Sequence, residues 1–131
     1  MPTTFEPLNQ EAIQHALEAI PFLQNPQTDL YVYNGPESLT PYTYHEQVET
    51  LIGNLYEARL IQASDWREWW PTAEAFFGGT EKLEEADLST LIRLFTAHIR
   101  KERFEEGHMV NLIESGYLLK LLQRLKAVAL T

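Results

Sequence analysis

Apolar residues recur every three to four positions over most of the chain, which is the spacing of an amphipathic helix. Between residues 88 and 106 this stripe is formed by Leu88, Leu91, Ile92, Phe95 and Ile99. Similar stripes cover residues 9–20, 43–55, 66–77 and 118–128. The pattern predicts an all-α fold, a compact bundle of five or six helices.

Polar residues mark where several of these helices begin. Asn9 and Asp87 stand where an N-cap is expected, because their short side chains accept hydrogen bonds from free N–H groups. Thr43 and Glu46 have the spacing of a capping box, which would place Tyr44 on the inner face of the helix that follows. Each signal predicts a helix start.

Glycines mark the expected ends of the later helices. Gly107 and Gly116 suit the left-handed backbone that stops a helix, so a two-turn helix is expected between them. In the last helix we expect Leu118, Leu121 and Leu125 to point inward and complete the core. The same apolar strip could instead form the seam of a homodimer.

Residues 25–42 break the helical pattern. Tyr31 and Tyr33 alternate with Leu30 and Val32, and the Asn34-Gly35-Pro36 turn follows. This alternation predicts one short β-hairpin near residues 30–42. A connection of this length is either a packed loop or a functional flap, and the tyrosines favour packing.

Composition limits the class of protein. With 131 residues and no cysteine, the chain is expected to form a single domain, residues 1–131, without disulfides or thiolate metal sites. It shows no apolar leader and no run long enough to span a bilayer, so we expect a cytoplasmic protein without membrane contact. Phosphate-loop, dinucleotide-binding and zinc-protease motifs are missing, and we expect no cofactor and no metal.

The net charge of −9 is unevenly distributed. Residues 1–58 hold eight acidic residues and no Lys or Arg, whereas residues 93–131 hold seven bases and four acids. Such an asymmetry can be satisfied within one domain, in a homodimer or by a protein partner. Nucleic acid is not an expected partner, because no recognised module or basic stripe is present.

The densest group of ionisable residues lies between Thr96 and His108. If the helix continued to Gly107, Glu106 would project into the apolar stripe, and Arg103 would be the nearest partner to neutralise it. We therefore expect an internal ion pair that joins the late helices. Phe104 falls almost opposite the stripe, so the helix could instead distort or stop near Phe104. The alternatives are an anion-binding or catalytic role for Arg100, Arg103 or His108, and plain surface charge.

Three tryptophans fall within five residues, after a helix start expected at Ser64 or Asp65. Trp66, Trp69 and Trp70 have i, i+3 and i+4 spacing and form one aromatic surface on a helix. Such clusters usually belong to the core, but an aromatic groove for a peptide or ligand is the alternative.

The late segment also resembles a known family. Thr96-x-x-x-Arg100-x-x-Arg103-Phe104-x-Glu106-Gly107 is followed by Ser115-Gly116 and Leu121-Leu122-x-Arg124-Leu125. This pattern is similar to that of small bacterial proteins catalogued as a domain of unknown function. The likeness is firmest over residues 96–125 and extends back to about residue 46. The family more often has Asp at the position of Glu102. The resemblance implies a single intracellular domain and adds no chemistry.

Two hypotheses for function follow. The first is a protein-interaction or regulatory module that uses Trp66, Trp69, Trp70 and the basic C-terminal face. The second is a protein or enzyme that binds a small anion, a phosphate or carboxylate, through Arg100 and Arg103, with Glu106 or His108 moving a proton. The missing motifs favour a non-enzymatic protein and single out no catalytic residue.

Overall fold

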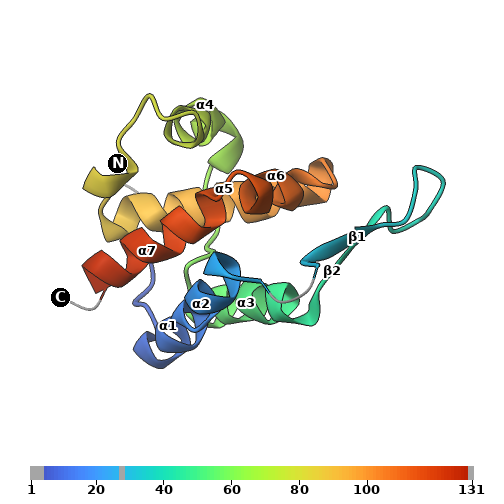
Figure 1. Cartoon of the computed structure of the whole chain (residues 1–131). Coiled ribbons are helices and arrows are strands. Elements are labelled where there is room, and N and C mark those ends of the chain that lie inside the picture. Colours follow the sequence, from blue (N-terminus) through green and yellow to red (C-terminus); the bar gives the residue numbers. More distant parts are fainter. Residues whose placement is uncertain (1–4, 27–28, 130–131) are drawn as a thin grey trace.

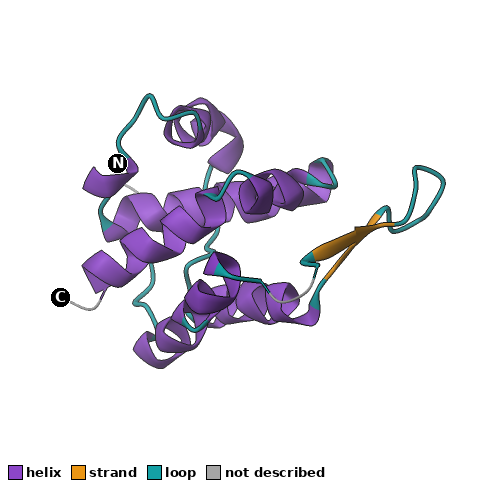
Figure 2. Ribbon diagram, viewed as in Figure 1, coloured by secondary structure: helices purple, strands orange, loops and turns teal. Residues whose placement is uncertain are grey.

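The computed structural model describes residues 5–26 and 29–129, and these residues are mostly helical (Figures 1 and 2). The described elements, in order, are α1 (Gln10–Leu17), α2 (Ala19–Gln24), β1 (Tyr31–Tyr33), β2 (Tyr42–Tyr44), α3 (Glu46–Glu57), α4 (Trp66–Phe77), the 3₁₀ turn η1 (Leu83–Glu85), α5 (Leu88–Phe104), α6 (His108–Glu114) and α7 (Tyr117–Ala129). If α1 and α2 are counted as one bent helix, the predicted bundle of up to six helices with one short hairpin is confirmed.

The bend between α1 and α2 has a local cause. Pro21 lacks an N–H group, and its ring clashes with the carbonyl four residues earlier, at Leu17. The regular helix therefore ends at Leu17, and the Glu18 N–H bonds to the carbonyl of His15 at 3.2 Å. At the other end, the Asn9 side chain accepts from the Ala12 N–H at 3.2 Å, which confirms the predicted N-cap.

The helices pack in three levels around α5 and α7. Figure 1 shows α5, α6 and α7 across the middle, α1, α2 and α3 on one side, and α4 on the opposite side. The largest side chains with almost no exposed surface lie between these levels and include Phe95, Leu91, Leu121 and Ile13. Burial of each such side chain contributes about 1.5–3 kcal/mol, so α5 and α7 hold the bundle together.

Helix α5 begins as predicted and ends earlier than its apolar stripe suggested. The Asp87 side chain accepts from the Thr90 N–H at 2.8 Å, which confirms the N-cap. The last helical residue is Phe104, and Gly107 follows with a φ of +95°. Gly107 therefore adopts the predicted left-handed conformation, but it stands just before α6 and not at the end of a longer α5.

The hairpin is an arm that projects from the helices (Figure 2). Strands β1 and β2 are antiparallel, with Tyr31 opposite Tyr44 and Tyr33 opposite Tyr42. Leu39, in the loop between the strands, is 98% exposed. The arm is bonded to the helices at its base, while its tip stands in solvent.

The capping box predicted at Thr43 and Glu46 is wrong. Thr43 lies in β2, where its hydroxyl accepts from the Asn34 side chain at 2.8 Å. Helix α3 is capped instead by His45, whose Nδ1 accepts from the Gln47 N–H at 3.1 Å. The second strand extends further than the sequence indicated, because it pairs with β1 and removes Thr43 from the helix.

The leucines of α7 belong to the core of this chain. Leu121, Leu122 and Leu125 have no exposed surface, and Leu118 is 2% exposed. The apolar strip considered as a homodimer seam is thus covered by the chain's own helices. Among the described residues, no helix combines the length and apolar character needed to cross a bilayer.

Candidate functional site

The three clustered tryptophans lie on α4 and contact α5 at three places. Arg93 carries its guanidinium carbon 5.7 Å from the Trp69 ring. Further along α5, the Trp70 ring lies 5.3 Å from His98, and the Trp66 ring lies 5.8 Å from Phe104. All three indoles are partly buried, so each both packs on the bundle and keeps accessible surface.

Trp66 and Trp70 line a hollow of about 490 Å³, together with Arg67, Lys101 and Phe104. We call this surface the aromatic hollow. The Trp66 and Trp70 rings meet edge to face at 87°. Phe104, the last residue of α5, is 64% exposed, although large apolar side chains are usually covered. Two helices therefore place three aromatic rings around one open depression.

The charged residues of the aromatic hollow are both cations. Arg67 places its guanidinium carbon 4.3 Å from the centre of the Phe104 ring, and Lys101 places its ammonium 5.2 Å from that of Trp70. These contacts hold each cation over an aromatic face. Lys101 also pairs with exposed Glu105 at 3.5 Å, but none of the described residues that line the hollow carries a carboxylate.

Behind Trp70 lies a buried pair of histidines. His98 Nδ1 and His108 Nε2 are 2.9 Å apart, and the ring centres are 5.2 Å apart with an 8° angle between the planes. With the nitrogens 2.9 Å apart, the ring centres can be as far apart as 5.2 Å only when the two nitrogens point straight at each other. The rings therefore meet edge to edge and share one N–H···N hydrogen bond. A zinc ion needs about 2 Å to each nitrogen, so none fits between them.

The enclosure of this pair decides its charge. Burial, and to a smaller extent the nearby His108, lower the pKa of His98 to about 3. The pKa of His108 is also lowered, by burial and then by Lys101, while Glu105 opposes the change. Both imidazoles are therefore neutral at pH 7. His98 Nε2 and the hydroxyl of neighbouring Tyr117 are buried without a hydrogen-bond partner among the described residues.

The expected burial of Glu106 is wrong. Its side chain is exposed and makes no ion pair with any residue that the structure describes. Because α5 ends at Phe104, the chain turns before Glu106 reaches the apolar stripe. The half-buried carboxylate of this segment is Glu102, which accepts from the Tyr44 hydroxyl and from the N–H groups of Gly107 and His108, at 3.0 and 3.2 Å from its Oε2.

Glu102 connects three elements. It lies on α5, binds the first N–H groups of α6 and is bonded to Tyr44 of the arm. Burial raises its pKa, while these hydrogen bonds oppose the rise. Burial and the same carboxylate also raise the pKa of Tyr44, so the phenol stays protonated and donates. Glu102 thus performs the joining role that the sequence suggested for Glu106, but through hydrogen bonds.

The two arginines of the charged segment do not meet Glu106 or His108. Arg103 is exposed and lies 3.5 Å from the Tyr56 hydroxyl, at the limit of a hydrogen bond. Arg100 is partly buried on α5, and His108 is 6% exposed and bonded to His98. Among the residues described, the structure does not bring these four side chains together in one hollow.

Sequence reasoning singled out Trp66 and Trp70 but missed Arg67, Lys101 and Phe104. One signal was present: on the helical periodicity, Phe104 falls opposite the apolar stripe of α5. An aromatic residue on the polar face of a helix indicates an exposed ring. The partners from α4 could not be found without the packing of the two helices.

A comparison with protein families matches residues 8–131 to the family of unknown function DUF6508. The chain belongs to this family. The match begins well before residue 46, so the DUF6508 pattern includes α1 and the arm as well as the late helices, and the suspected resemblance is confirmed. No curated protein and no solved structure matches the chain. The DUF6508 assignment therefore supports one continuous family region and assigns no activity.

Proposed function

We propose that this protein is a protein-interaction module and that the aromatic hollow is its contact surface. The observation that carries the proposal is the exposed Phe104 ring, which stands beside two indoles and under the Arg67 guanidinium. Tryptophan and arginine are the residue types that most often dominate the energy of protein interfaces. A shallow depression of this composition suits one or two side chains of a partner.

The charges of the hollow select the chemistry of the partner. Arg67 and Lys101 attract carboxylates, while the aromatic rings favour an apolar side chain. We therefore propose an acidic peptide segment that carries a leucine or phenylalanine. Because residues 1–58 hold eight acidic residues and no Lys or Arg, the N-terminal part of the protein repels such a segment, whereas the two cations of the hollow attract it.

The proposal is tested with two synthetic peptides of equal length. In one peptide, glutamates alternate with leucines; in the other, lysines replace the glutamates. We expect the acidic peptide to bind at least ten times more tightly, with quenching of tryptophan fluorescence and weaker binding at high salt. Equal affinity for the two peptides, or no binding of either, overturns the proposal.

Variants locate the contact. Phe104→Ala removes an exposed ring and is expected to leave the unfolding temperature nearly unchanged while it weakens peptide binding about tenfold. Arg67→Glu should reverse the preference between the two peptides. The matched control is Leu39→Ala at the tip of the arm, which also removes an exposed apolar side chain and should bind the acidic peptide like the wild type.

The second hypothesis, anion binding by Arg100 and Arg103, has weaker support. Arg103 reaches the Tyr56 hydroxyl, and His108 bonds to His98. These contacts do not direct the two side chains towards one shared ligand. The test is thermal unfolding of wild type, Arg100→Lys and Arg103→Lys with and without inorganic phosphate. Stabilisation of wild type that either substitution removes would favour this hypothesis over the interaction module.

A further inference from the structure

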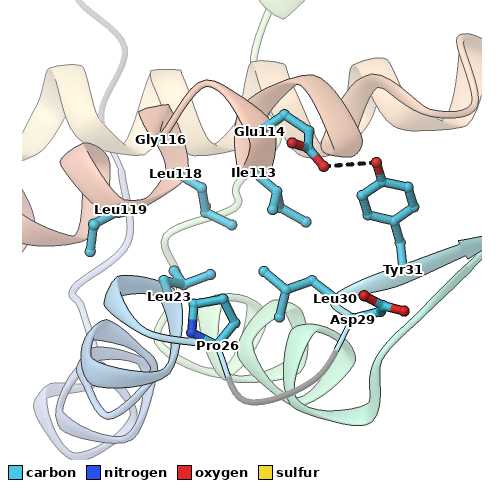
Figure 3. A pocket seen from close by; sticks show the side chains of 10 residues that line it. All are labelled: Leu23, Pro26, Asp29, Leu30, Tyr31, Ile113, Glu114, Gly116, Leu118 and Leu119. Carbon is cyan, nitrogen blue, oxygen red and sulfur yellow. Dashed lines mark hydrogen bonds between the residues drawn. The ribbon is translucent and has the colours of Figure 1, made fainter.

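A second hollow, of about 480 Å³, is lined on one side by described residues at the end of α2 and the start of β1 and on the other side by residues of α6 and α7 and the turn between them (Figure 3). We call it the leucine hollow. Its apolar wall is formed by Leu23, Leu30, Ile113, Leu118 and Leu119. The volume is within the range of about 300–1,000 Å³ that small-molecule sites occupy in proteins. Part of an apolar molecule can therefore be covered here.

Polar groups gather at one end of the leucine hollow. Figure 3 shows Glu114, Tyr31 and Asp29 at one end, with Leu23 and Leu119 at the other. The Tyr31 hydroxyl donates to Glu114 Oε1 at 2.7 Å, which orients this carboxylate and leaves Oε2 available. A single hydrogen bond across 83 residues of sequence thus fixes a negative group beside an apolar wall.

The balance of charge at this end is negative. Among the described residues that line the leucine hollow there is no Lys, Arg or His, whereas two carboxylates are present. The first turn of α7 is nearby, but a helix N-terminus supplies only about half a positive charge. Two full negative charges outweigh it, so the hollow favours a cation and repels an anion.

We infer that the leucine hollow binds a small amphipathic amine, with the ammonium group between Glu114 and Asp29 and the apolar body against the leucines. The ammonium donates to Glu114 Oε2 and to the Asp29 carboxylate, while Tyr31 holds Glu114 in place. Each methylene group that is buried contributes about 0.8 kcal/mol, which is about a fourfold gain in affinity. This inference is independent of the aromatic hollow, with which the leucine hollow shares no lining residue.

The test compares ligands that differ only in their head group or tail. Binding of hexylammonium, hexanol and hexanoate to the full chain is followed by chemical-shift changes of the backbone amides. We expect hexylammonium to bind most tightly and hexanoate least tightly, with shifts centred on Leu30 and Leu118. Replacing butylammonium by hexylammonium should increase the affinity about fourfold for each added methylene.

Substitutions separate the charge from the cavity. Asp29→Asn and Glu114→Gln should each lower the affinity for hexylammonium about fivefold, as expected for an exposed ion pair, and leave that for hexanol unchanged. Tyr31→Phe frees Glu114 from its hydrogen bond and should have a smaller effect of the same sign. The matched control is Glu37→Gln on the arm, an exposed carboxylate outside the hollow, which should bind like the wild type.

Three outcomes would overturn the inference. The first is equal affinity for hexanoate and hexylammonium, which would show that charge does not select the ligand. The second is unchanged amine binding by the double variant Asp29→Asn/Glu114→Gln. The third is the absence of any saturable shift at the leucine hollow with the amine in the millimolar range.

Discussion

Tyr31 and Tyr44 stand opposite each other across the two strands of the arm, and together they hold both ends of α6. Tyr31 donates directly to Glu114, the last residue of α6. Tyr44 donates to Glu102, which in turn accepts the N–H groups of Gly107 and His108 at the start of α6. One cross-strand pair therefore positions a helix more than sixty residues later in the chain.

The role of Glu102 can be tested against that of Glu106. Glu102→Ala leaves the Gly107 N–H and the hydroxyl of half-buried Tyr44 without their acceptor, whereas the His108 N–H keeps the Glu105 carbonyl at 3.1 Å. We expect the free energy of unfolding to fall by about 2 kcal/mol. Glu106→Ala changes an exposed side chain and should stay within about 0.5 kcal/mol of wild type. Urea unfolding of both variants measures the difference. A larger loss for Glu106→Ala would contradict the structure.

The two tyrosines should not contribute equally. Tyr44→Phe removes a partly buried hydrogen bond to a carboxylate, and we expect it to cost about 1–2 kcal/mol of stability. Tyr31→Phe removes a bond to Glu114 that is open to water and should cost less than about 0.5 kcal/mol. Hydrogen exchange gives the local measurement: Tyr44→Phe should speed exchange at the first turn of α6. Equal effects of the two substitutions would show that burial does not set their contribution.

Gly107 combines two constraints, of which Gly116 shares only one. Its φ is +95°, and an added Cβ would lie 2.7 Å from Cε2 of Tyr42. Gly116 has a φ of +80° but no atom within 4 Å of an added Cβ. We expect Gly116→Ala to cost about 1–2 kcal/mol from backbone strain alone and Gly107→Ala to cost more, because Tyr42 must move. Thermal unfolding of the two variants compares them, and equal costs would mean that Tyr42 adapts freely.

Stability should fall as the pH drops below the ordinary histidine range. The pKa of His98 is about 3 in the folded protein and 6.5 ordinarily, so below pH 6.5 the unfolded chain binds a proton that the folded chain refuses. The contribution of neutral His98 to the free energy of unfolding is therefore complete above pH 6.5 and is lost progressively as the pH falls towards 3. For His98 alone, the free energy of unfolding should fall by about 2 kcal/mol between pH 6.5 and pH 5.

The comparison with His98→Gln isolates this effect. The raised pKa of Glu102 acts in the opposite sense, since the folded state then binds the extra proton, but it is present in both proteins. We expect the variant to be less stable at pH 7 and to lose less stability than wild type between pH 7 and pH 5. Denaturant unfolding at a series of pH values measures both. Identical slopes for the two proteins would refute the assignment of a buried neutral imidazole.

Helical periodicity was sufficient to place α5, α6 and α7, because their apolar stripes and glycine stops act locally. The end of α5 was different. The sequence left two alternatives open, a helix that stops near Phe104 and one that carries Glu106 inward, and the second was wrong. The chain turns at Glu105 and Gly107, where Gly107 must accommodate Tyr42 of the distant arm. Local pattern could not distinguish Glu102 from Glu106, since the difference depends on contacts with another element.

The candidate site shows the same limit. The spacing of Trp66 and Trp70 indicated a shared surface, but the position of Phe104 opposite the stripe was not interpreted as an exposed ring. These residues meet because of the way α4 packs across α5, and this packing cannot be predicted from the spacing of residues along the sequence. The His98–His108 pair was missed for a similar reason: the two residues belong to different helices, and the turn at Gly107 brings them within 2.9 Å.

The hydrogen bond between His98 and His108 also provides a natural spectroscopic marker. Imidazole protons in contact with water exchange too quickly to be detected, but this one is enclosed by the rings of Trp70, Phe77 and Tyr117. Its resonance should therefore appear far from the other signals of the protein. The proton exchanges with solvent only when α5 and α6 separate. The rate at which its signal decays in heavy water therefore measures how often this part of the core opens, without an added label.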